Sequence, residues 1–204
     1  MRIVTLFIVG LVMAGCASPT IDANVTAFHT PELSNIRDKT IAIRADPPSR
    51  ETSLEFLNYR PKIAAKLQHV GFDVVENASG PDYIARVSYG VEGTESHSSI
   101  TPSPTFGFGY FGGGPVYYGG AINRSYNTRT WVDYNRYIAL DIIEGETADR
   151  ESPTRIYEGR AQSSGRCPTV AGVFDEMLDA LFRDFPGANG KTVFISVPWD
   201  GSCE

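Results

Sequence analysis

Several signatures of common enzyme classes are missing from this sequence. It holds three cysteines but no Cys-x-x-Cys pair, which argues against a dithiol redox catalyst. Its three histidines, His29, His69 and His97, lack the spacing of metal ligands. No Gly-x-Ser-x-Gly motif is present, and the glycine-rich residues 107–115 are not followed by the Lys-Ser/Thr pair of a phosphate-binding loop. We therefore predict no catalytic residue, no metal and no cofactor.

An excess of positive charge is missing as well. The formal net charge is -6, and acidic and basic residues are interspersed along the chain. Without a basic stripe, DNA and RNA are excluded as partners. Asp141 and Glu144 stand three apart on a predicted strand, so they point to opposite faces and do not form a pair. Asp175, Glu176 and Asp179 fall on the polar side of a predicted helix, where we expect solvent.

The N-terminal apolar run is too short for a membrane-spanning helix. It covers residues 3–15, follows Met1-Arg2 and is succeeded at once by polar residues. Spanning a bilayer takes about 20 consecutive apolar residues. One positive charge, a short apolar segment and small residues before Cys16 are typical of a secretory signal peptide over residues 1–15.

The end of this segment, Met13-Ala14-Gly15-Cys16, resembles the lipobox of bacterial lipoproteins. The resemblance implies cleavage before Cys16, lipidation of its thiol, and a spacer over residues 16–23. Two or more acyl chains make a lasting anchor, whereas one chain binds only marginally. Ala17 in place of an aspartate implies the outer membrane, with the domain facing the periplasm. The alternative is an ordinary cleavable signal that happens to precede a cysteine.

Two cysteines then remain, Cys167 and Cys203. In an oxidising periplasm such a pair most economically forms a disulfide, and the alternative is two free thiols. The bridge would close a loop of about 36 residues and stabilise the fold by about 4 kcal/mol in the chain-entropy estimate. It would also tie down the C-terminal tail.

Alternation of apolar and polar residues, and for residues 72–76 a short apolar run, predicts the strands of a sheet. The expected strands are 24–30, 39–45, 72–76, 82–93, 129–145, 155–164 and 191–198.

Two helices are predicted from apolar residues at helical spacing. In the first, within residues 46–72, Pro61 allows either a start near Asn58 or a longer helix with a kink, and Gly71 ends it. The second lies within residues 169–187 with Thr169 as its N-cap. We therefore expect one domain over residues 24–204, an α/β two-layer sandwich with a mostly antiparallel sheet and both amphipathic helices on one face.

Residues 94–127 are rich in glycine, proline, serine and aromatic residues and show no apolar periodicity, which predicts a long loop. Exposed aromatic side chains on this loop are candidates for binding an envelope protein, a glycan or the lipid surface. The alternative is a flexible insertion that folds back over its own sheet. The candidate binding residues are Phe106, Phe108, Tyr110, Phe111, Tyr117 and Tyr118.

An ordered series of segments resembles a family of bacterial lipoproteins. After the lipobox come "ANVTAFHTPELSNIRDKTIAI", "LQHVGFDVVE", "PDYIARVSYGVEG", "YIALDIIEG" and "IYEGRAQSS". Over residues 24–187 this order is similar to the family called domain of unknown function 4136 (DUF4136). The family supplies no catalytic motif. The turn "EGETADRESPTR" and the tail over residues 189–204 depart from its pattern.

The sequence thus predicts a membrane-anchored periplasmic lipoprotein that acts as a non-catalytic binding or scaffolding module of the cell envelope. Two alternatives stay open. The first is an envelope hydrolase acting on glycan or lipid, for which two converging carboxylates in a cleft would be the evidence. The second is an accessory component of a secretion or assembly complex, which self-association through an open sheet edge would indicate.

Overall fold

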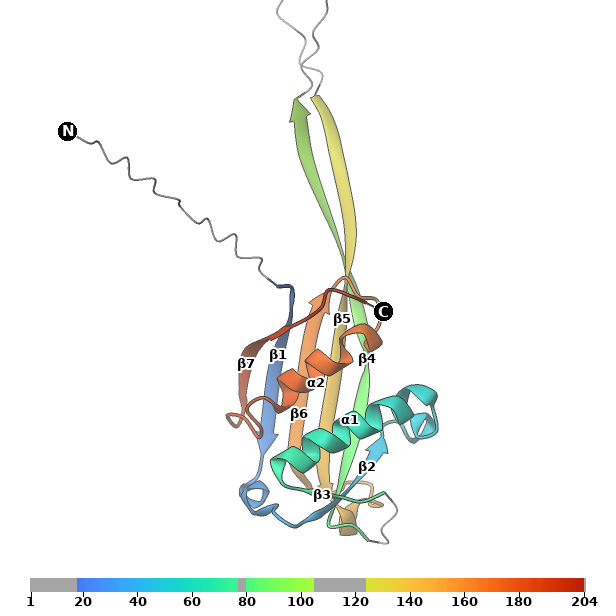
Figure 1. The fold of residues 1–204 in the computed structure, drawn as a ribbon, viewed down its shortest axis with the longest axis vertical. Helices are drawn as coiled ribbons and strands as arrows, with labels where there is room; N and C mark the ends of the chain where they lie inside the picture. The colour runs from blue at the N-terminus through green and yellow to red at the C-terminus, as the bar shows by residue number, and fades with distance from the viewer. Residues whose placement is uncertain (1–17, 77–79, 105–123, 204) are drawn as a thin grey trace, which may run out of the picture.

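The computed structural model describes residues 18–76, 80–104 and 124–203 of the chain. In these residues one mixed sheet of seven strands, in the order β3-β2-β4-β5-β6-β1-β7, forms one layer, and two helices lie across one of its faces (Figure 1). The strands are β1 Thr20–His29, β2 Thr40–Ala45, β3 Asp73–Val74, β4 Tyr83–Pro104, β5 Arg124–Glu144, β6 Arg155–Gly165 and β7 Lys191–Pro198. The helices are α1 Leu54–Val70 and α2 Phe174–Phe182.

The prediction of a mostly antiparallel sheet is wrong. Strand β2 pairs in parallel with both β3 and β4, while β4, β5, β6, β1 and β7 form antiparallel pairs. The physical reason is the connection through α1. A helix that returns the chain from β2 to the same edge of the sheet makes a crossover, and crossovers join parallel strands. The strand, helix, strand order of residues 39–76 is the sequence pattern of such a crossover.

The structure of α1 shows which of the two helix starts predicted around Pro61 is correct. The helix begins at Leu54, with the Ser53 side chain accepting a hydrogen bond from the Phe56 amide at 3.1 Å. Pro61 therefore lies inside the longer helix. Gly71 ends it with a left-handed conformation (φ 114°), which glycine adopts without a steric penalty.

Helix α2 is shorter than predicted. A 3-10 turn over Ala171–Val173 precedes it and Val173 occupies the N-cap position, so the prediction of Thr169 as N-cap is wrong. The apolar stripe explains the error, because Val170 and Val173 are buried although they precede the α-helix proper.

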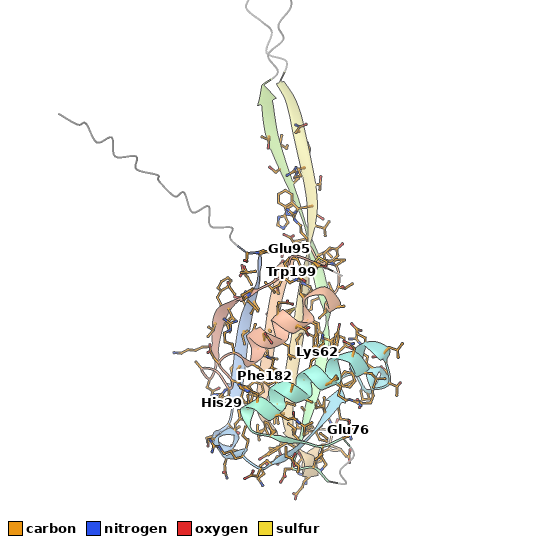
Figure 2. All side chains as sticks on the ribbon, viewed as in Figure 1. His29, Lys62, Glu76, Glu95, Phe182 and Trp199 are labelled. Carbon is orange, nitrogen blue, oxygen red and sulfur yellow. A yellow bond between two sulfur atoms is a disulfide. The ribbon has the colours of Figure 1, made fainter. Side chains whose placement is uncertain are left out.

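The two helices also contact each other. Lys62 and Lys66 on α1 form ion pairs with Asp175 and Asp179 on α2, at 2.7 and 2.6 Å (Figure 2 labels Lys62). The polar side of α2 therefore faces α1 at these positions rather than solvent alone. Beneath it, the rings of Tyr59 and Phe174 stack with centroids 3.6 Å apart.

The prediction of a loop over residues 94–127 is wrong for its described parts. β4 and β5 remain paired out to Pro104 and Arg124, well beyond the body of the sheet. This hairpin extends from the end of the sheet at which β1 begins (Figure 1). Most residues of this ladder are polar, and apolar ones such as Ile100 and Val132 are exposed, so the sequence shows no apolar periodicity here. The six aromatic candidates between residues 106 and 118 lie outside the described residues, as does Cys16.

The C-terminal segment is tied back to the domain. Cys167 and Cys203 form a disulfide, with Cα atoms 5.4 Å apart, as the sequence analysis favoured. Trp199, at the same end of the sheet as Glu95 in Figure 2, donates an indole hydrogen bond to the Gly172 carbonyl at 3.3 Å. Among the described residues, neither helix combines the length and the apolar character that crossing a bilayer requires.

Candidate binding site beside strand β7

Strand β7 forms one outer edge of the sheet. It pairs with β1 in continuous register from Thr20↔Pro198 to Ala27↔Lys191, without a bulge. On its other side no strand follows within the described part of the chain. The six residues from Thr192 to Val197 carry no charge, so the edge lacks the charges and bulges that usually block strand pairing.

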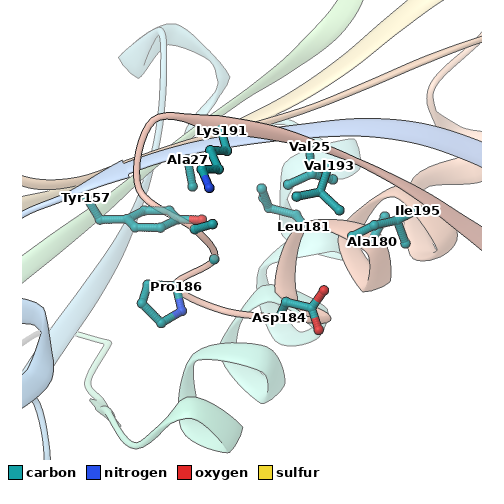
Figure 3. A pocket seen from close by; sticks show the side chains of 12 residues that line it. Val25, Ala27, Tyr157, Ala180, Leu181, Asp184, Pro186, Lys191, Val193 and Ile195 are labelled. Atoms are coloured by element: carbon teal, nitrogen blue, oxygen red, sulfur yellow. The ribbon is translucent and has the colours of Figure 1, made fainter.

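A pocket of about 440 Å³ lies under this strand, between β7, β1, α2 and the segment that joins α2 to β7 (Figure 3). Most of its lining is apolar, from Val25, Ala27, Ala180, Leu181, Pro186, Val193 and Ile195. Tyr157, Asp184 and Lys191 supply the ionisable side chains. In Figure 3, Tyr157 and Lys191 stand at one end of the pocket and Asp184 at the other. The arrangement suits a largely apolar group that carries a polar end.

Tyr157 is the most unusual of these residues. Its side chain is only 1% exposed, yet its hydroxyl group points into the pocket and has no hydrogen-bond partner among the described residues (Figure 3). Burial raises the pKa of the phenol, so it stays protonated at neutral pH and keeps a hydrogen to donate. The hydroxyl is not one of the fully buried polar atoms that lack a partner, so it stays open to the pocket, where a bound polar group can accept its hydrogen.

Two neighbours hold the Tyr157 ring in this position. Its centroid lies 4.8 Å from that of Phe185, in the segment that follows α2. On the sheet side the ring lies over Gly159, where an added Cβ would come within 2.3 Å of the hydroxyl oxygen. Gly159 is therefore needed for the ring to lie along β6.

The segment over the pocket is fixed to the end of β1. Asn189 accepts from the His29 amide at 3.1 Å and donates to the His29 carbonyl at 3.0 Å. The Gly190 amide donates to the Ala27 carbonyl at 2.8 Å. These hydrogen bonds make the pocket a preformed feature rather than a gap between mobile segments.

A second polar cluster lies on the opposite face of the sheet. Asp141 on β5 is directly opposite Glu158 on β6, beside a depression of about 370 Å³ that Phe28 also lines. Burial raises the pKa of Asp141, and the nearby Glu158 charge raises it further. Arg155 lies between the two carboxylates, with its Nε atom 3.4 Å from Asp141 and 3.2 Å from Glu158.

Sequence reasoning found only part of these arrangements. It excluded a pair of Asp141 with Glu144 and did not find that Glu158, on the neighbouring strand, lies directly opposite Asp141. The predicted hairpin between residues 129–145 and 155–164 makes these two strands neighbours. It does not give the register that places Asp141 opposite Glu158. Alternation along a strand shows which side chains face inward, but it does not show which of them lack a hydrogen-bond partner. Tyr157 and Lys191 were therefore not predicted as site residues. Within the described ranges, no group of three or more His, Cys, Asp or Glu side chains is placed to hold a metal ion.

Comparison with known proteins adds little to this geometry. No protein-family model matches the chain, and no curated protein matches it. Among solved structures, it is similar to the crystal structure of a PDZ domain protein from Parabacteroides distasonis, with 13% sequence identity and a TM-score of 0.43. The alignment covers 87% of this chain and 39% of that one, so the chain spans less than half of its length. A likeness of this size assigns neither the fold nor a function.

Proposed function

We propose that this protein is an outer-membrane lipoprotein, anchored through an acylated Cys16, that acts as a non-catalytic binding module of the cell envelope. The observation that carries the binding role is the apolar pocket with the unpartnered Tyr157 hydroxyl, which opens beside an unblocked strand edge. The lipobox and the resemblance to the DUF4136 lipoproteins support the anchor. β1 begins at Thr20, so only Ala17–Pro19 would separate the domain from the lipid.

The chemistry of the pocket favours binding over catalysis. Its ionisable side chains are a phenol with a raised pKa, one lysine and one carboxylate, and Lys191 and Asp184 stand at opposite ends in Figure 3. Nucleophilic catalysis needs a base within hydrogen-bond reach of the nucleophile. The described lining residues do not offer such a pair, whereas an apolar lining with a few polar groups is typical of a ligand site.

The anchor is tested by labelling cells with an alkyne fatty acid. We expect the protein to take up the label and to fractionate with the outer membrane, and the Cys16→Ala variant to lose both properties. An unlabelled wild-type protein released into the periplasm would refute the anchor.

The binding role is tested by filling the pocket. Val193 lines the pocket and is 41% exposed, so Val193→Trp blocks it without disturbing the core. The matched control is Val132→Trp on the β4–β5 hairpin, where the valine is 37% exposed. After crosslinking in cells, we expect a specific partner with the wild type and the control but not with Val193→Trp. Equal crosslinking by all three proteins would contradict the proposal.

The Asp141–Glu158 cluster supports a second candidate function, an envelope hydrolase. A carboxyl group whose pKa is raised beside a second carboxylate is the usual acid of a glycosidase. Arg155 opposes this role, since it neutralises the pair. Asp141→Asn and Glu158→Gln would abolish turnover of an envelope glycan if the cluster were catalytic. Under the binding function, purified wild-type protein shows no turnover to lose.

A further inference from the structure

The edge of β7 and the pocket beneath it form one continuous site. We propose that this site takes an extended segment of another envelope protein, which adds as a further strand beside β7 and places an apolar side chain in the pocket. The inference rests on the proposed function and deepens it, since it names the class of partner.

The strand edge selects a polypeptide. Along an outer strand, alternate backbone N–H and C=O groups point away from the sheet, and an extended chain pairs with them in register. The eight residues of β7 keep an unbroken register with β1, so the outer edge presents a straight ladder. The one charged residue of β7, Lys191, and its one proline, Pro198, lie at the two ends of the strand. A glycan or a lipid tail offers no matching row of donors and acceptors.

The pocket selects the side chains of that segment. Lys191, Val193 and Ile195 all line the pocket and alternate along β7, so their side chains point to the helix side of the sheet. In an added strand about 4.8 Å away, every second side chain points the same way. One large apolar side chain then fills the space between Val193 and Leu181.

The anchored end of the chain argues against a second copy as the occupant. Two identical β7 strands pair symmetrically only when antiparallel. Thr20 lies opposite Pro198, so such a pair would set the two anchored ends apart along the strands. Over the eight residues of β7 that separation is about 24 Å, while the spacer from Cys16 to Thr20 reaches about 14 Å at most. Both copies of such a pair would stay anchored only with their strands lying along the membrane surface.

The test uses the full protein from membranes, in lipid nanodiscs, followed by hydrogen–deuterium exchange. The probe is the peptide acetyl-KTVTVTVTK-amide at millimolar concentration, and its fully N-methylated analogue is the control that cannot pair as a strand. We expect the probe to slow amide exchange over Thr192–Val197 by about tenfold and to leave Asp73–Val74 unchanged. The analogue should have no effect.

Substitutions localise the effect. Val193→Lys puts a charge on the edge and should remove the protection, while Val132→Lys, of matched exposure, should keep it. No slowing at β7, or equal slowing in Val193→Lys, overturns the inference. Protection that appears without peptide as protein concentration rises, and that Val193→Lys abolishes, identifies a second copy and also overturns it. Slowing by the probe in a protein that carries no lipid would instead refute the anchor and leave the strand site standing.

Discussion

The two outer edges of the sheet differ in whether they are blocked against a further strand. β3 consists of two residues, of which Asp73 carries a charge, and it lies close to α1. β7 is eight residues long, uncharged from Thr192 to Val197, and exposes Val193 and Phe194. Proteins usually block strand edges by shortening, charging or covering them. The β3 edge uses these devices and the β7 edge does not, so of these two edges β7 is the one suited to receive another strand.

The two edges are also held in place differently. Asp82, at the start of β4, fixes the β2 side by accepting hydrogen bonds from the Thr40 amide, the Thr40 hydroxyl and the Lys39 ammonium group. The chain after β7 is held by the Cys167–Cys203 disulfide. Each of these supports offers a way to disturb one edge and leave the other intact.

The largest effect should follow removal of the disulfide. Cys203→Ser opens a loop with a sequence separation of 36 residues, which should lower the free energy of unfolding by about 4 kcal/mol. Urea unfolding measures the loss, and hydrogen exchange should show faster opening of β7 than of β3. Reduction of the wild type should produce the same loss. A change below about 1 kcal/mol would mean that the tail is held by other contacts.

The next effect concerns the pocket floor. Gly159→Ala places a Cβ within 2.3 Å of the Tyr157 hydroxyl oxygen, so the ring must move. Overpacking of this kind lowers the free energy of unfolding by about 1–3 kcal/mol. Near-UV circular dichroism and urea unfolding measure the change. In a Tyr157→Ala background the same substitution should be nearly neutral, and an unchanged cost there would show that the ring is not the obstacle.

A smaller, pH-dependent effect is expected at the β3 side. The Thr40 hydrogen bonds, with help from Lys39, lower the pKa of Asp82 to about 2. Because the folded pKa lies below the unfolded value, the stabilisation is present above about pH 4 and is lost as the pH falls through 2. Asp82→Asn should therefore cost about 1 kcal/mol at pH 7, a figure reduced for solvent screening at this exposed site.

Urea unfolding at pH 7 and pH 2 tests this prediction. The difference between wild type and Asp82→Asn should shrink at the lower pH. Asp149→Asn, on the exposed turn after β5, is the control and should match the wild type at both values. A constant difference between Asp82→Asn and the wild type would show that the effect is not electrostatic.

The smallest effect on folding comes from a charge on the open edge. Phe194 is 64% exposed, so Phe194→Lys should change the free energy of unfolding by less than about 0.5 kcal/mol. In the unanchored Cys16→Ala protein it should slow edge-to-edge aggregation several-fold, as measured by light scattering. Leu54→Lys, on a residue 86% exposed at the start of α1, adds the same charge away from the edge. Equal slowing by both variants would point to net charge rather than to the strand edge.

Much of the local structure was predictable from the sequence. The strands of the sheet body were predicted, several of them from alternation and residues 72–76 from a short apolar run, and Gly71 marked the end of α1. The outer halves of β4 and β5 were missed because a ribbon with solvent on both sides needs no apolar face. The N-cap at Ser53 was not predicted, because a proline is tolerated in the first turn of a helix and Pro61 therefore allowed a start near Asn58. The first structure is held by a backbone ladder and the second by a side-chain cap, and apolar periodicity records neither.

The sequence by itself determined which side chains face the helix layer, because alternation along a strand is a local property with a period of two residues. Only the tertiary structure decided that β2 runs parallel to its neighbours, that Glu158 meets Asp141, and that β7 lies at an edge above the unpartnered Tyr157 hydroxyl. These outcomes depend on which strands become neighbours. That choice is made by the packing of segments far apart in the chain, and no local pattern encodes it.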